Sequence, residues 1–111
     1  MSDDDTALAH RTGAVAVLAT PVVIALCEEA AILALGGALE ADETTVSSRV
    51  ELSHITPVAV GATVTAVAVL ERIEGRRLIF AVSVDDARGL VAAGRVTRVI
   101  VETERFMKKT L

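Results

Sequence analysis

The chain has 111 residues, which is enough for one domain built around a single hydrophobic core. Hydrophobic residues make up 52% of it, but it has no Trp or Tyr and only two Phe, so Val, Ala, Leu and Ile must fill the core. The net charge is −4 and no basic cluster or aromatic platform occurs, so nucleic acid is not an expected partner. The single cysteine excludes an intramolecular disulfide.

The first long element is predicted to be an apolar helix of about four turns. Residues 1–13 are polar and are expected to be irregular or to form a short helix, and residues 14–19 form an apolar lead into the main helix. Thr20 is expected to cap this helix, with Pro21 at its first position. Gly36-Gly37 is expected to end it, because glycine enters the left-handed conformation at little cost.

Glu28 and Glu29 are the only charged residues in this helix, so it has no polar face and is expected to be buried on all sides. A membrane span is not expected, because each central charge costs roughly 2.5–3.5 kcal/mol by insertion scales. The predicted helix, at roughly fifteen residues, is also too short to span a bilayer. Residues 1–5 are acidic, the wrong sign for a signal peptide, so a cytoplasmic location is expected.

After residue 42, apolar residues recur at every second position, and this alternation predicts β-strands. Strands are predicted over residues 45–54, 63–73, 77–85 and 90–103. In the first strand, one face is expected to carry Val46, Val50, Leu52 and His54, and the other Thr45, Ser47, Arg49, Glu51 and Ser53. The connections are short, so the strands are expected to pair antiparallel and to curl as one sheet around the helix, an α+β fold.

Valines on both faces of the predicted sheet indicate that a second copy covers part of it. The outer face of the second strand carries Val67 and Val69, and that of the last strand carries Val91, Val99 and Val101. A homodimer, or a dimer of dimers, is the expected assembly.

A set of residues spread over positions 14–107 resembles a known family. They are Val17-Leu18-Ala19-Thr20-Pro21, Glu28, His54, Pro57, Gly61, Val64, Gly75-Arg76-Arg77-Leu78, Phe80, Val82, Asp86, Gly94, Arg98 and Phe106. In these positions the chain is similar to the fluoroacetyl-CoA thioesterase-like family of hotdog-fold thioesterases. The resemblance implies a single hotdog domain over residues 1–111, a dimer, and hydrolysis of an acyl-CoA thioester. It leaves the acyl group open, since the fluorinated substrate belongs to a specialised member.

The resemblance also implies which residues act. Thr20, Glu28 and His54 would be the catalytic set, with Glu28 as nucleophile or general base and His54 handling protons. Helix-start amides around Thr20, Pro21 and Val22 would polarise the thioester carbonyl, and the substrate would also meet Arg98 and Ser47. Coenzyme A would enter only as part of the substrate, and the sequence has no metal-ligand set, phosphate loop or serine nucleophile motif.

Each of these residues also has a purely structural interpretation. Glu28 can emerge at a helix edge, His54 can be a packing histidine, and Thr20 can serve only as a helix cap. Arg98 lies on an apolar face and needs a partner, which can be Glu28, an acyl substituent or a main-chain carbonyl. Thr20 and Glu28 are separated by a helical rise of roughly 12 Å, so they are expected to be bridged by His54 or water, or to belong to a site shared by two subunits.

Three departures from the family pattern keep other functions open. The additional strand that members usually have before the segment corresponding to residues 3–13 is not expected here. Ser47 stands where glycine is frequent, and Val96 stands where a polar residue, often histidine, is found. A non-catalytic acyl-CoA binding module is the first alternative. A hotdog enoyl-thioester hydratase is the second, although its acid usually lies close to the histidine in sequence rather than on the central helix.

Overall fold

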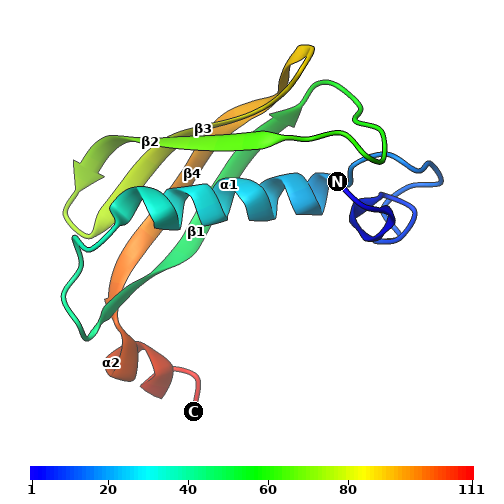
Figure 1. Cartoon of the computed structure of the whole chain (residues 1–111). Coiled ribbons are helices and arrows are strands. Elements are labelled where there is room, and N and C mark those ends of the chain that lie inside the picture. The colour runs from blue at the N-terminus through cyan, green and yellow to red at the C-terminus, as the bar shows by residue number, and fades with distance from the viewer.

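One antiparallel sheet with a long helix across one face forms the body of the molecule (Figure 1). The computed structural model describes residues 1–111. Its elements are a 3₁₀ helix Asp3–Asp5, α1 Thr20–Leu35, β1 Glu43–His54, β2 Thr65–Glu74, β3 Arg77–Asp86, β4 Gly89–Glu102 and α2 Thr103–Lys108. The strand order is β1-β4-β3-β2, and every neighbouring pair is antiparallel. The α+β class and the four predicted strands are therefore confirmed.

The start of α1 differs from the sequence prediction by one residue. Ala19 is the capping residue and makes no side-chain capping bond, Thr20 is already helical, and Pro21 lies at the second position. The prediction of Thr20 as the cap was wrong because its hydroxyl has a partner elsewhere in the fold. The end of α1 is as expected: Gly36 follows it with a φ of 55°, in the region where residues with a Cβ are strained.

The core lies between α1 and the sheet. Val23, Cys27 and Ala31 of α1 are fully buried and pack with Phe80 and Val96 of the sheet. The opposite side of α1 is open, with Ile32 51% and Leu33 75% exposed. Burial of the helix on all sides was therefore a wrong expectation for the single chain, because four strands cover only one side of it.

A β-bulge in β1 changes which residues face α1. Ser47 pairs with Arg98 while Arg49 pairs with Thr97, so Ser48 is an extra residue without a partner in register. The bulge reverses the alternation. The α1-facing residues of β1 are therefore Thr45, Ser47, Val50, Leu52 and His54, while Val46 pairs with Val99 on the other face. The predicted faces were right from Val50 onward and wrong for Thr45, Val46 and Ser47.

The two termini add short pieces to this frame. Residues 1–13 contain the 3₁₀ helix and an irregular turn, and the amide of Ala7 bonds the carbonyl of Val17 beside the start of α1. The C-terminal helix α2 was not predicted, because residues 90–103 continue one apolar pattern into it. No helix in the structure combines the length and the apolar character that crossing a membrane requires.

Candidate active site

Thr20 and His54 meet where α1 begins and β1 ends. Thr20 is the first residue of α1 and His54 the last of β1, and Thr20 Oγ1 lies 2.9 Å from His54 Nδ1. The other ring nitrogen, Nε2, is buried and has no hydrogen-bond partner. A buried polar atom without a partner is rare in proteins, and a catalytic role is one of the reasons for which such an atom is retained.

A pocket of about 340 Å³ lies beside the Thr20–His54 pair. Its lining combines four polar residues with five apolar ones: Thr12, Thr20, His54 and Thr56, and Ala7, Val17, Leu18, Ile55 and Pro57. The residues come from the N-terminal segment, the start of α1 and the loop after β1. Such a mixed lining suits a ligand that has one polar reacting group and an otherwise apolar body.

The first turn of α1 offers one free amide rather than several. The amides of Val22 and Val23 both bond the carbonyl of Ala19 at 3.1 Å, and Pro21 has no N–H. The Thr20 N–H makes no hydrogen bond within the chain. The expected group of donors at Thr20, Pro21 and Val22 is thus corrected to a single donor, on the same residue whose hydroxyl contacts His54.

Glu28 and Arg98 form a second pair, at the middle of α1. Arg98 Nη1 lies 3.4 Å from Glu28 Oε1, and Arg98 is only 6% exposed. Arg98 also donates from Nε to Thr45 Oγ1 and from Nη2 to the Thr45 carbonyl, each at 2.9 Å. Of the partners considered for the buried arginine, two are therefore present together, and they offset the cost of burying its charge.

The two adjacent carboxylates of α1 have different surroundings. The Glu28 side chain is 28% exposed and bonds Arg98 through Oε1 only, whereas Glu29 is exposed and has no salt bridge. Ser47 is the register partner of Arg98 on the α1 side of the sheet, and it is exposed. Glu28, Arg98 and Ser47 therefore lie in one region, and Glu29 lies outside it.

No hydrogen bond joins the Thr20–His54 pair to the Glu28–Arg98 pair. Eight residues of helix separate Thr20 from Glu28, a rise of about 12 Å. The structure brings each pair together but leaves the two pairs apart within one chain.

Thr45 is the member of this region that the sequence pattern missed. The strict alternation of β1 placed Thr45 on the face away from His54, but the bulge at Ser48 turns it toward α1. The only signal in the sequence is the polar pair Ser47-Ser48 inside an otherwise alternating strand.

Cys27 lies next to Glu28 on α1 and is fully buried. Burial raises the pKa of its thiol, and the negative charge of Glu28 raises it further. Because the thiolate is the reactive form of cysteine, Cys27 serves as a core residue rather than as a nucleophile.

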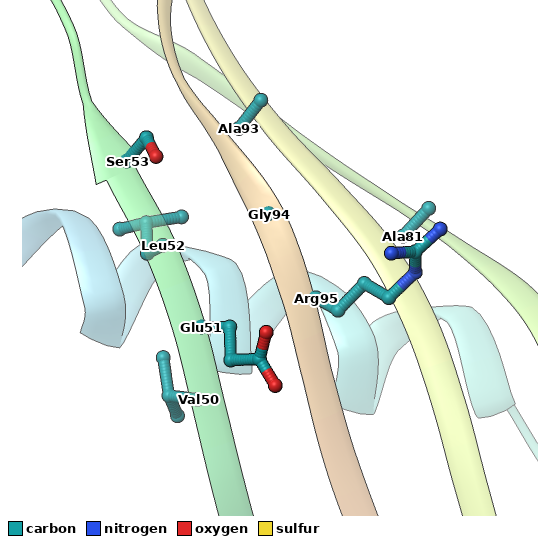
Figure 2. Close-up of a pocket in the computed structure, with 8 residues that line it drawn as sticks. All are labelled: Val50, Glu51, Leu52, Ser53, Ala81, Ala93, Gly94 and Arg95. Atoms are coloured by element: carbon teal, nitrogen blue, oxygen red, sulfur yellow. The ribbon is translucent and has the colours of Figure 1, made fainter.

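A larger pocket lies elsewhere in the molecule. It measures about 680 Å³ and opens on the side of the sheet away from α1, where Figure 2 shows the helix passing behind the strands. Its lining is Val50, Glu51, Leu52, Ser53, Ala81, Ala93, Gly94 and Arg95, none of which was a predicted site residue. No group of three or more His, Cys, Asp or Glu side chains is arranged to hold a metal ion.

Comparison with known proteins shows the family of this chain. Residues 1–104 match the family described as fluoroacetyl-CoA-specific thioesterase, FlK. The fluoroacetyl-CoA thioesterase of Streptantibioticus cattleyicolor is 32% identical over 93 residues, which cover 84% of this chain and 67% of that enzyme.

Two solved structures extend the agreement to the fold. A point mutant of FlK in complex with fluoroacetate and CoA superimposes with a TM-score of 0.89 and 28% identity, over 96% of this chain and 90% of that one. A hot-dog-like protein from Thermanaerovibrio acidaminovorans superimposes with a TM-score of 0.91 and 28% identity, over 99% of this chain and 82% of that one. The chain is thus a hotdog-fold thioester hydrolase that belongs to the fluoroacetyl-CoA-specific thioesterase family.

Proposed function

We propose that this chain, acting as a homodimer, hydrolyses an acyl-CoA thioester through Glu28, His54 and Thr20. The observation that carries the proposal is the state of Glu28, a half-buried carboxylate whose Oε1 is held by Arg98 while Oε2 makes no hydrogen bond. A carboxylate with one fixed and one free oxygen is suited to attack a carbonyl carbon or to take a proton from water.

The start of α1 would receive the thioester. The free Thr20 N–H, reinforced by the positive end of the helix dipole, would donate to the carbonyl oxygen as negative charge develops on it. Pro21 and Val22 would line this position, with Arg98 and Ser47 meeting the substrate at the other pair. Glu28 either takes a proton from water, whose oxygen then attacks the carbonyl, or attacks the carbonyl itself to form an anhydride that water hydrolyses afterwards. In both routes the C–S bond breaks and one proton of the consumed water, relayed through His54, passes to the leaving thiolate.

A second copy of the chain is part of the proposal because neither the Thr20–His54 pair nor the Glu28–Arg98 pair is a whole site by itself. Ile32 and Leu33 on α1, and Val67, Val69 and Ile73 on the edge strand β2, form apolar surface that a partner would cover. A two-fold axis that packs two α1 helices antiparallel would bring the Glu28 of one chain to the Thr20–His54 pair of the other.

Coenzyme A would act as part of the substrate, without any separate cofactor, since the proposed steps use only side chains, one amide and water. A cytoplasmic location is proposed as well, because a lone free cysteine is usual where disulfides are rare. Nucleic acid and membrane are not proposed as partners, in keeping with the net charge of −4.

Turnover of a panel of acyl-CoA thioesters, followed by release of free thiol, tests the hydrolysis. The wild-type chain is expected to cleave at least one thioester of the panel. Glu28→Gln should remove most of that activity because it removes the charge and keeps the shape, whereas Glu29→Gln should have little effect. Binding of the thioesters without any release would instead favour an acyl-CoA binding module.

Mixed dimers test whether two chains share each site. Glu28→Gln and His54→Ala chains are each expected to be nearly inactive alone. When they are refolded together, half of the dimers are mixed and each has one intact shared site, so roughly a quarter of wild-type activity should return. No recovery, with mixed dimers verified by mass, would place each complete site within one chain.

A further inference from the structure

The bulge at Ser48 decides the position of Thr45, a residue outside the proposed catalytic set. Ser48 has no register partner, and its hydroxyl lies 3.4 Å from the carbonyl of Thr97, to which it donates. Without the extra residue, the alternation would place Thr45 on the outer face of the sheet. With it, Thr45 faces α1 and is only 8% exposed.

Thr45 makes two contacts with Arg98, which use two neighbouring donors on one edge of the guanidinium group. Nε donates to the hydroxyl of Thr45 and Nη2 to its carbonyl, each at 2.9 Å. The guanidinium is a rigid plane with donors in fixed directions, so two bonds to one residue fix the orientation of that plane. The remaining nitrogen, Nη1, then points to Glu28 Oε1 at 3.4 Å.

We propose that Thr45 is a positioning residue for the reaction, acting on Glu28 through Arg98. This inference rests on the proposed function, since it takes Glu28 to be the reacting carboxylate. A glutamate on a helix has rotatable torsions that let its carboxylate turn, and a long arginine from β4 adds more freedom. Thr45 fixes the arginine, the arginine holds Oε1, and Oε2 is left in one direction.

Thr45→Val tests the hydroxyl alone, because valine keeps the branched shape and the main-chain carbonyl. It is expected to lower kcat by about 10–100-fold, the effect of losing one hydrogen bond to a charged group, with little change in KM. Thr45→Ser keeps the hydroxyl and should restore most of the turnover. Thr44→Val is the matched control, because Thr44 is exposed and pairs with Val101 on the other face.

A purely structural role is separated from positioning by combining the substitutions. In a Glu28→Gln chain, which has no carboxylate to orient, Thr45→Val should not lower the residual turnover further. An equal loss in both backgrounds would overturn the proposal, as would unchanged kcat in folded Thr45→Val. Should Thr45→Val fail to fold, Thr45→Ala carries the same expectations.

The Arg98 Nε–H signal in ¹⁵N NMR gives a readout that does not depend on activity. It should exchange slowly with solvent in the wild-type and Thr45→Ser chains and fast in Thr45→Val. Fast exchange already in the wild-type chain would overturn the positioning. Slow exchange in the wild type together with a fully active Glu28→Gln chain would instead refute the proposed role of Glu28.

Discussion

The hydroxyl of Thr20 lies 2.9 Å from Nδ1 of His54, although 34 residues separate the two in the sequence. A neutral imidazole has one nitrogen that donates and one that accepts. Whichever role Nδ1 plays toward Thr20, the buried Nε2 is left with an unused donor or acceptor. The pair therefore presents a ring nitrogen that is available for proton transfer.

Replacing His54 tests this availability. His54→Ala is expected to lower turnover per folded dimer by about 10²–10⁴-fold, the usual range for loss of a positioned acid or base. Folding is checked by circular dichroism. His10→Ala is the control, since His10 is exposed in the N-terminal segment. Near wild-type turnover in folded His54→Ala would leave His54 as a packing residue.

Gly94 is predicted to be irreplaceable in β4. A Cβ at this position would lie 1.9 Å from the carbonyl oxygen of Glu51, which belongs to the neighbouring strand and cannot move aside alone. Gly94→Ala should lower the free energy of unfolding by at least about 3 kcal/mol, measured by urea denaturation. Gly37→Ala, where a Cβ would meet nothing within 4 Å, should change it by less than about 0.5 kcal/mol. Equal stability of the two variants would contradict this packing.

Asp86 should make stability depend on pH in the acid range. Hydrogen bonds from the side chain and then the backbone of Arg88 lower the pKa of the Asp86 carboxyl. A folded pKa below the unfolded value, about 3.9, gives stability that is present above that pH and lost as the pH falls through the folded pKa.

Asp86→Asn is therefore expected to melt at a lower temperature than the wild-type chain near neutral pH. The difference should shrink as the pH falls below about 4. Thermal melting across this range measures it, with Asp85→Asn as control, because Asp85 is exposed and has no salt bridge. A difference that stays constant down to the lowest pH would show that the charge of Asp86 is not the cause.

Cys27 should resist alkylation in the folded protein. Its burial and the adjacent Glu28 charge both raise the pKa of the thiol and so suppress the reactive thiolate. Iodoacetamide at neutral pH is expected to label Cys27 only after denaturant is added, as followed by mass spectrometry. Fast labelling of the native protein would show that α1 opens readily.

Local sequence patterns were sufficient for the elements and for part of the site. Pro21 and Gly36-Gly37 bounded α1, since proline favours a helix start and glycine a helix end. Alternation placed His54 toward α1, because the run from Val50 to His54 contains no bulge. The resemblance to the family added Thr20, Glu28 and Arg98 to the predicted site. In the structure, Glu28 and Arg98 form a hydrogen-bonded ion pair.

What the sequence by itself determined was the order of helix and strands and the identity of the polar residues in apolar surroundings, because both follow from spacing along the chain. Only the tertiary structure decided that Thr20 bonds His54 instead of capping α1, and that Thr45 holds Arg98. These contacts depend on where β1 ends and on one extra residue at Ser48. A bulge changes the direction of a side chain without changing hydrophobicity, so the pattern of residue types does not reveal it.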